Sequence, residues 1–286
     1  MNILSLFDGM SCGQIALKKL KIPYDNYYAS EIDAHAMYIT QKNFPATIQL
    51  GNIKELSSAD LKSLPKIDLL MGGSPCQGFS FGGKGLNFDD PRSKLFFDFA
   101  KILEKINPKY FLLENVRMNK KSQDIISGIL GMEPIKINSS LVSAQNRVRL
   151  YWTNIIMDGT LKDEGLVLEN ILEKEVNIKY LAGEKLQQGY EGGNQLNPNF
   201  KSQCNTIYNR DGKFGTLCAG THGYSFGYVP INDFNYTFRK LTPLECERLQ
   251  TVPDNYTSGV SDTQRYKMLG NGWTIDVICH ILKNII

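Results

Sequence analysis

Hydrophobic positions in the first 155 residues alternate between short apolar runs and stretches with helical spacing. The apolar runs predict strands over residues 3–6, 27–30, 67–71, 110–113 and 148–155. The helical spacing predicts helices over residues 13–19, 34–43, 95–106 and 124–130. Repeated strand–helix–strand units of this kind predict an α/β fold: a doubly wound, mostly parallel sheet with helices on both faces, Rossmann-like in class.

The pattern changes after about residue 155. Residues 158–191 hold eight acidic and four basic residues, whereas residues 192–240 hold five basic, two acidic and nine Phe or Tyr residues. This composition indicates a second, smaller lobe of irregular or β-rich structure over 156–260. Most of its aromatic residues are expected to form a small second core. The run Thr242-Pro243-Leu244-Glu245 is a capping box with proline at the first helical position, so it predicts a helix.

Two further helices are predicted near the C-terminus. Ser261 opens one of them, and Gly270 is a residue that can end it. The last helix carries one apolar stripe, formed by Ile275, Ile278, Ile281, Leu282 and Ile285. Because a lone terminal helix must bury such a stripe, residues 261–286 are expected to return to the first domain, over 1–155.

Composition limits the class of protein. The chain has 286 residues, 42% of them apolar, and a net charge of +3, so it can fill a core but has no polybasic signature. No apolar run approaches the ~18 residues of a membrane span, and the N-terminal apolar run meets Asp8 too soon for a signal peptide. Six dispersed cysteines and three histidines favour free thiols in a reducing, cytosolic setting, with no structural metal.

A glycine-containing turn follows the first predicted strand and opens the first predicted helix. Gly9 and Gly13 are spaced G-x-x-x-G there, unlike the G-x-G-x-x-G of dinucleotide sites. Glu31 ends the next strand, and in a doubly wound sheet these two strand ends lie side by side at the ligand crevice. A carboxylate at that place can accept hydrogen bonds from both ribose hydroxyls. The alternative interpretation is a tight strand–helix turn beside a surface glutamate.

A cysteine lies in a polar, glycine-rich segment directly after the strand predicted at 67–71. Pro75 biases Ser74 toward extended geometry, which fixes the chain as it enters Cys76. A lone cysteine is most often a small buried hydrophobe, but the polar neighbours and the strand end favour a reactive thiol here. Residues 72–92 contain six glycines with one lysine and one arginine, which indicates a basic loop able to close over an anionic substrate.

Charged side chains end the next strand and begin the last one. Glu114 comes one strand–helix–strand unit after Cys76, and right-handed crossover places both strand ends on the same sheet edge. Arg147 and Arg149 enter the last strand, where alternation places them on one face that could hold an anion or a carbonyl oxygen. The alternative interpretations are a solvated glutamate at a strand end and arginines in surface ion pairs.

Taken in order, these segments resemble the DNA (cytosine-5) methyltransferase family over nearly the whole chain. The resemblance covers its cofactor loop, ribose carboxylate, nucleophile loop, acid motif, arginine motif, the helix that braces the second lobe, and the last cofactor contact. The matching segments are 7–13, Glu31, 74–77, 114–116, 145–149, 239–250 and 270–271. Two positions depart from the family pattern: Asn52 replaces the usual Asp but can still accept a hydrogen bond from an adenine amino group, and Trp273 follows Gly272.

The resemblance implies transfer of a methyl group from S-adenosyl-L-methionine to C5 of cytosine in double-stranded DNA. Cys76 is then the thiolate that adds to C6, Glu114 the acid that hydrogen-bonds N3, and Arg149, together with Arg147, holds O2 or organises the loop. The implied cofactor-binding residues are Phe7, Asp8, Gly9, Met10, Ser11, Cys12, Gly13, Glu31, Ile32, Asn52, Ile53, Pro75, Leu95, Asn271, Gly272 and Trp273.

Because the target carbon is stacked inside duplex DNA, the base must rotate out of the helix, at a cost of about a few kcal/mol. The lobe over 156–260 is the candidate for target recognition. The expected DNA-contacting residues are Gln77, Ser80, Lys84, Arg92, Lys201, Arg210, Lys213 and Thr216. We expect a monomer in a bacterial or phage-type cytoplasm, associated with the nucleoid. Double-stranded DNA and a cognate restriction endonuclease are its expected partners, and no membrane is expected.

Three alternatives stay open at this point. A tRNA cytosine-5 methyltransferase would use the same chemistry, and the size of the middle lobe favours DNA without excluding RNA. An inert DNA-binding regulator on the same fold is disfavoured because Cys76, Glu114 and both arginines are all present. A nicotinamide oxidoreductase is a distant third, since the glycine spacing is wrong for it.

Overall fold

The chain divides into two compact units in the computed structural model. The structure describes residues 1–75, 94–181, 196, 203–220, 224, 226–231 and 238–285. The first unit comprises Met1–Ile137, Val148–Gly159 and Ile278–Ile286, and the second comprises Asn138–Arg147 and Thr160–Val277. Among the described residues, no helix is long and apolar enough to cross a membrane.

The first unit is built on a seven-stranded sheet in the order β3-β2-β1-β4-β5-β7-β6. Its strands are β1 (Asn2–Leu6), β2 (Asn26–Ser30), β3 (Ile48–Gln49), β4 (Leu69–Gly73), β5 (Tyr110–Val116), β6 (Ile135–Asn138) and β7 (Val148–Thr153). β1 pairs in parallel with β2 and β4, and β4 pairs in parallel with β5, whereas β7 runs antiparallel to β5. The predicted doubly wound, mostly parallel α/β sheet is confirmed. From β1, the chain adds strands first on one side (β2, β3) and then on the other (β4, β5). Doubly wound sheets bind their ligands at this switch point, between β1 and β4.

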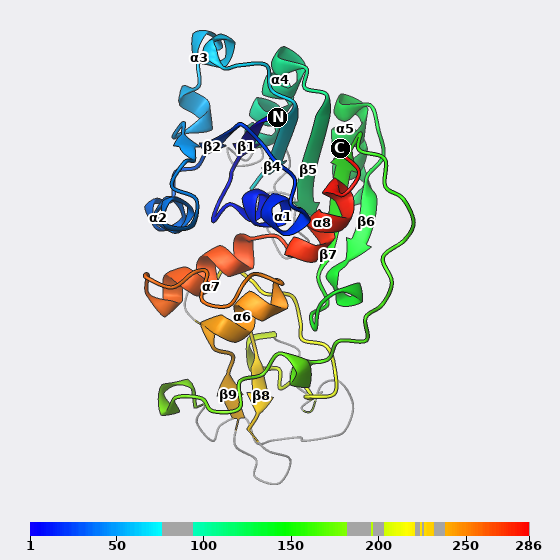
Figure 1. The fold of residues 1–286 in the computed structure, drawn as a ribbon. Coiled ribbons are helices and arrows are strands. Elements are labelled where there is room, and N and C mark those ends of the chain that lie inside the picture. Colours follow the sequence, from blue (N-terminus) through cyan, green and yellow to red (C-terminus); the bar gives the residue numbers. More distant parts are fainter. Residues whose placement is uncertain are drawn as a thin grey trace. The chain divides into compact units, whose positions relative to one another are not determined.

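Helices cover both faces of this sheet. They are α1 (Cys12–Leu20), α2 (Ala34–Asn43), α3 (Ser58–Ser63), α4 (Lys94–Ile106), α5 (Lys120–Leu130) and α8 (Ile275–Leu282). Figure 1 shows α1 and α8 on one face, and α4 and α5 on the other. The Cys279 thiol of α8 lies 3.7 Å from the Ala16 carbonyl oxygen of α1. All five residues of the predicted C-terminal apolar stripe are buried. Ile278–Ile286 belongs to the first unit, whereas residues 261–277 are grouped with the second.

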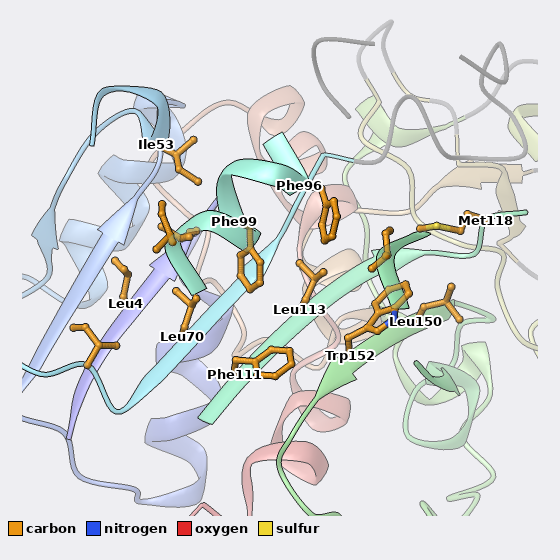
Figure 2. Close-up of a cluster of buried hydrophobic side chains, with 14 residues drawn as sticks. Leu4, Ile53, Leu70, Phe96, Phe99, Phe111, Leu113, Met118, Leu150 and Trp152 are labelled. Carbon is orange, nitrogen blue, oxygen red and sulfur yellow. The ribbon is translucent and has the colours of Figure 1, made fainter. Parts of the chain in front are cut away.

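Alternation along the strands separates the two faces. Leu4, Leu70 and Leu113 belong to one buried cluster with Phe99 of α4 and Trp152 of β7 (Figure 2). The neighbouring residues face α1: a Cβ added at Gly13 would lie 2.5 Å from Cε of Met71 and 2.8 Å from Oη of Tyr27. The lack of a side chain at Gly13 therefore lets α1 pack closely over Met71 of β4 and Tyr27 of β2.

The second unit contains a small antiparallel pair, β8 (Tyr228–Pro230) and β9 (Phe238–Lys240), followed by α6 (Pro243–Leu249) and α7 (Asp262–Asn271). Tyr208, Phe214, Phe226 and Phe238 are all buried, as expected for a second aromatic core. The capping box at Thr242 is present and begins α6.

The prediction that Gly270 ends α7 is wrong, because the helix continues to Asn271. A Cβ at Gly270 would lie 1.9 Å from the carbonyl oxygen of Cys218, so glycine is needed there for a close backbone contact and not for a turn. Short 3-10 turns complete the described fold: η1 (Ile53–Glu55), η2 (Ser139–Leu141), η3 (Leu168–Asn170), η4 (Ile178–Tyr180) and η6 (Gln203–Asn205).

Candidate active site

The ends of β1, β2 and β3 meet at one edge of the sheet. The Asp8 amide donates to the Ser30 carbonyl at 3.2 Å, and the Ser30 hydroxyl donates to the Gly51 carbonyl at 2.8 Å. Phe7, Gly9 and Ser11 have positive φ angles of 58°, 59° and 63°. A left-handed backbone is uncommon for a bulky residue such as Phe, so this turn is held in shape by its surroundings.

The carboxylate of Glu31 is fixed by three backbone amides. Its Oε2 accepts from the Gly9 amide at 2.7 Å, and its Oε1 accepts from the amides of Ile32 and Asp33 at 2.7 and 2.8 Å. Oε1 already accepts two hydrogen bonds and Oε2 only one, so Oε2 can still accept a hydrogen bond from a hydroxyl. The predicted pair, the glycine turn and Glu31, is in direct contact.

Asp8 lies beneath this turn in a buried polar cluster. Its Oδ1 accepts from the Tyr27 hydroxyl at 2.8 Å, while its Oδ2 is buried with no hydrogen-bond partner. Burial raises the pKa of Asp8 to about 6, against hydrogen bonds from Ser5, Tyr27 and Ser11 that lower it, and the negative charge of Glu31 adds to the rise. Tyr27, which packs under the loop, was not among the predicted site residues.

The other predicted cofactor residues of the first unit differ in how far they are buried. Met10, Ser11, Cys12 and Ile53 are buried, and Ile53 belongs to the cluster shown in Figure 2. Leu95 packs on that same cluster, and Pro75 is half-buried at the end of β4. Ile32, by contrast, is 73% exposed. The Asn52 side chain caps η1 by accepting from the Lys54 amide at 3.1 Å, and its amide donates to Glu55 at 3.2 Å.

The ends of β4 and β5 also lie together at this edge. Gly73 is paired with Glu114 across the two strands. The Asn115 side chain donates to the Ser74 hydroxyl at 3.0 Å, a contact between the acid motif and the nucleophile loop that the sequence did not predict. The described chain stops at Pro75, so the predicted nucleophile Cys76 lies outside the described residues.

Arg149 reaches the same place from the antiparallel strand β7. Its Nε lies 3.0 Å from Oε1 of Glu114, and both side chains are nearly buried, at 13% and 10% exposed. This Nε makes no aligned hydrogen bond, while Nη1 donates to the Val148 carbonyl at 2.9 Å. The edge therefore presents a carboxyl group and a guanidinium group close together, with one N–H not committed to a well-aligned acceptor.

Arg147 belongs to the second unit and precedes β7, so the alternation argument applies to Arg149 alone. Its side chain is 2% exposed and donates to the carbonyls of Leu217, Gly270 and Gly272 at 2.9, 3.0 and 2.8 Å. Asn271 is exposed and Trp273 is buried in the same unit.

The predicted DNA contacts are only partly described. Arg210 is bound by both carboxylate oxygens of Glu169, at 2.5 and 2.9 Å, and Lys213 donates to the carbonyl of Ser140 at 2.7 Å. Thr216 is half-buried, and its hydroxyl donates to the Asn146 carbonyl at 2.6 Å. Gln77, Ser80, Lys84, Arg92 and Lys201 lie outside the described residues. The DNA contacts all stay predictions.

Metal ligation finds no support in the described part of the chain, where no group of three or more His, Cys, Asp or Glu residues could hold an ion.

Comparison with known proteins finds relatives that match the whole chain or nearly all of it. The type II methyltransferase M1.ScrFI of Lactococcus lactis subsp. cremoris is 32% identical over 309 residues, covering 100% of this chain and 78% of that protein. The type II methyltransferase M.DsaV of Dactylococcopsis salina is 29% identical over 93% of this chain and 82% of its own length. Among solved structures, the Entamoeba histolytica methyltransferase EhMeth is similar with a TM-score of 0.79 and 21% identity, over 99% of this chain and 97% of that one.

The family described as C-5 cytosine-specific DNA methylase matches residues 1–130 and 141–286. These two ranges contain the whole carboxyl edge of the sheet, from the glycine turn to Arg149, and all of α6, α7 and α8. The chain belongs to the C-5 cytosine-specific DNA methylase family and is an enzyme of that family.

Proposed function

We propose that the chain transfers a methyl group from S-adenosyl-L-methionine to C5 of cytosine in double-stranded DNA. The observation that carries this proposal is the grouping of Glu114 and Arg149, 3.0 Å apart, beside the segment that leads into Cys76. A cytosine ring offers an N3 and an O2 that match one acid and one N–H donor.

The residues at the ends of β1, β2 and β3 fit the methyl donor. Cβ atoms added at Gly9 and Gly51 would meet nothing within 4 Å, so a ligand can approach the backbone at both. Glu31 would accept from a ribose hydroxyl through Oε2, and the exposed Ile32 would pack on the adenine ring. Asn271, Gly272 and Trp273 of the second unit stay predicted donor-binding residues. When bound, S-adenosyl-L-methionine supplies an electrophilic methyl group.

The protein's own groups would prepare the cytosine. The Cys76 thiolate adds to C6, which makes C5 electron-rich enough to take the methyl group. The protonated carboxyl of Glu114 donates a hydrogen bond to N3 and draws charge from the ring, and Arg149 holds O2. Solvent water takes the C5 proton as the C6–S bond breaks, which restores the aromatic ring and the Cys76 thiolate.

The partners follow from the same proposal. Both curated relatives carry the designation type II methyltransferase, and we propose the same class here, with a cognate restriction endonuclease as the partner enzyme. The chain would act as a monomer in the cytoplasm of a bacterial or phage-infected cell, on nucleoid DNA.

Two experiments test the function. Bisulfite sequencing of DNA from cells that express the chain should reveal protected cytosines in one sequence context. Incubation with duplex DNA that carries 5-fluorocytosine in that context should give a covalent complex, because only a working nucleophile forms it. Methyl incorporation into tRNA and not into duplex DNA would contradict the proposed substrate, and the absence of any trapped complex would contradict the chemistry.

A further inference from the structure

The serine that precedes α1 has a backbone conformation that residues with a side chain disfavour. Ser11 has φ 63° and ψ 49°, in the left-handed region, where a side chain crowds the following carbonyl oxygen. Ser11 and Gln14 have the S-x-x-Q spacing of a capping box, in which the serine is extended and its side chain caps the helix. Ser11 makes no side-chain cap of that kind, so the pair serves another purpose here.

The hydroxyl of Ser11 is held by the side chain of Gln14. Gln14 Nε2 donates to Ser11 Oγ at 2.8 Å and to Thr47 Oγ1 at 2.7 Å, which uses both of its N–H groups. Its Oε1 accepts from the Tyr24 hydroxyl at 2.7 Å. Ser11 and Gln14 are 0% and 1% exposed, so these hydrogen bonds form away from water, where breaking one is costly.

The outer partners determine which end of the Gln14 amide faces Ser11. Tyr24 donates its hydroxyl proton to the amide oxygen, which leaves the NH₂ group directed at Ser11. Thr47 Oγ1 donates its own proton to the Phe44 carbonyl at 2.8 Å, so toward Gln14 it can only accept. The segments that lead into β2 and β3 therefore fix the orientation of the amide, and through it the side chain of Ser11.

Ser11 lies in the turn to which the proposed function assigns the methyl donor. The Gly9 end of this turn is held by Glu31, which accepts from the Gly9 amide, and by Thr40, whose hydroxyl donates to the Gly9 carbonyl at 3.3 Å. Gln14 holds the Ser11 end. Without Gln14, other backbone conformations of Ser11 become populated, and a ligand that fits only one conformation then binds more weakly in proportion.

We propose that Gln14 is a positioning residue for the methyl donor, because it keeps Ser11 in the left-handed conformation of the donor-binding turn. This rests on the proposed function, which assigns residues 7–13 to the donor. Gln14 acts through Ser11, since its own polar atoms are used by Ser11, Thr47 and Tyr24. Glycine adopts a positive φ about as readily as a negative one, so Ser11→Gly should make Gln14 dispensable for donor binding.

The test is the dissociation constant of S-adenosyl-L-homocysteine, measured by calorimetry with and without Ser11→Gly. Gln14→Met keeps the length of the side chain and removes the amide. Alone, it should raise the constant about 5- to 30-fold, the affinity equivalent of the cost of a left-handed backbone. Added to Ser11→Gly, it should raise the constant less than about twofold. Other contacts of the Ser11 hydroxyl cancel, because both proteins of the second pair lack it.

A milder variant keeps the test valid if Gln14→Met does not fold. Tyr24→Phe removes only the hydroxyl that binds Gln14 Oε1 and keeps a ring beside Tyr27, where the two ring centroids lie 5.8 Å apart. It should raise the constant about 2- to 5-fold alone, in line with one neutral hydrogen bond, and should leave it unchanged when added to Ser11→Gly.

A matched control removes a buried side-chain hydrogen bond from the other face of the same sheet. Ser127 of α5 accepts from Trp152 Nε1 at 3.1 Å, and both residues are buried. Figure 1 shows α5 on the face opposite α1. Ser127→Ala should lower the free energy of unfolding, measured by urea denaturation, and leave the dissociation constant unchanged.

Two results would overturn the positioning role: an unchanged constant in Gln14→Met, or an equal rise with and without Ser11→Gly, which would mean that Gln14 acts by packing alone. If the wild-type chain binds S-adenosyl-L-homocysteine and methylates cytosine while either result is found, only this inference fails. A wild-type chain that does not bind S-adenosyl-L-homocysteine contradicts the proposed function as well.

Discussion

Polar side chains are held differently at the sheet edge of the first unit and in the interior of the second. At the edge, Asp8 Oδ2 and Arg149 Nε are buried without a hydrogen-bond partner. In the second unit, Arg147 donates to three carbonyls, and the fully buried Glu245 accepts from Arg239 and from backbone amides. Gln264 of the second unit has an unpartnered oxygen too, but it lies outside these buried networks.

The difference indicates what each region is for. A buried polar group without a partner costs about 1–3 kcal/mol of stability, so a cluster of such groups points to a ligand or a reaction. A fully satisfied buried network fixes a conformation instead. Substitutions at the edge should therefore change chemistry and binding with little loss of stability, while substitutions in the second unit's network should lower stability.

Replacement of the proposed nucleophile should give the largest effect on methyl transfer. In Cys76→Ser, methyl transfer should fall by at least about 10³-fold, as expected when a covalent catalyst loses its attacking group. Radiolabelled methyl incorporation into duplex DNA measures the loss, and a gel-shift assay should show that duplex binding is retained. Full activity in this variant would remove Cys76 from the mechanism.

The buried acid of the second unit should give the largest effect on stability. Glu245 binds both Nη atoms of Arg239 at 2.8 and 2.6 Å and also accepts from the amides of Thr242 and Glu173. Glu245→Ala leaves a buried guanidinium unpaired and should lower the free energy of unfolding by about 3–5 kcal/mol, measured by urea denaturation. Glu169→Ala breaks the more exposed pair with Arg210 and should cost only about 0–1 kcal/mol. Equal losses would show that burial does not distinguish the two pairs.

The ribose carboxylate should affect binding more than stability. Both oxygens of the Glu31 carboxylate accept backbone N–H bonds, and Glu31→Gln replaces one of them with an NH₂ group that only donates. The side chain can then no longer accept hydrogen bonds from both the glycine turn and a ribose hydroxyl. The dissociation constant of S-adenosyl-L-homocysteine should rise about 10- to 100-fold, the usual worth of a hydrogen bond to a charged group. Glu104→Gln, on the exposed side of α4, should leave the constant unchanged. An unaltered affinity in Glu31→Gln would refute the ribose role.

These two regions also differ in how far the sequence could predict them. Local signals sufficed where the contact is local: the helix begun at Thr242 and the turn beside Glu31 follow from neighbouring residues and strand order. The hydrogen bonds of Arg147 could not be found this way, since its acceptors lie 70 to 125 residues away and are backbone carbonyls that carry no sequence signature. Gly270 was misassigned for the same reason, because its neighbour across the fold is the Cys218 carbonyl.

Replacing Asp8 should change the free energy of unfolding only slightly at neutral pH. The sign of this change distinguishes the sheet edge of the first unit from the hydrogen-bonded network of the second. Burial raises the pKa of Asp8 from 3.8 to about 6, so the folded state binds a proton more tightly than the unfolded chain does. Stability at this site is greatest below about pH 4, falls as pH rises through about 6, and stays reduced above it. The whole change is at most about 3 kcal/mol.

Asp8→Asn removes this titration while keeping an oxygen that can accept from the Tyr27 hydroxyl. The new amide also needs a buried partner, which costs about 1–3 kcal/mol, so the net gain in unfolding free energy at pH 7 should be about 1 kcal/mol. Urea denaturation of both proteins between pH 4 and pH 7.5 measures the difference, which should favour the variant increasingly as pH rises. A variant less stable at pH 7 by the same margin as at pH 4 would mean that Asp8 is satisfied in the folded protein, and the edge would then resemble the second unit's network instead of contrasting with it.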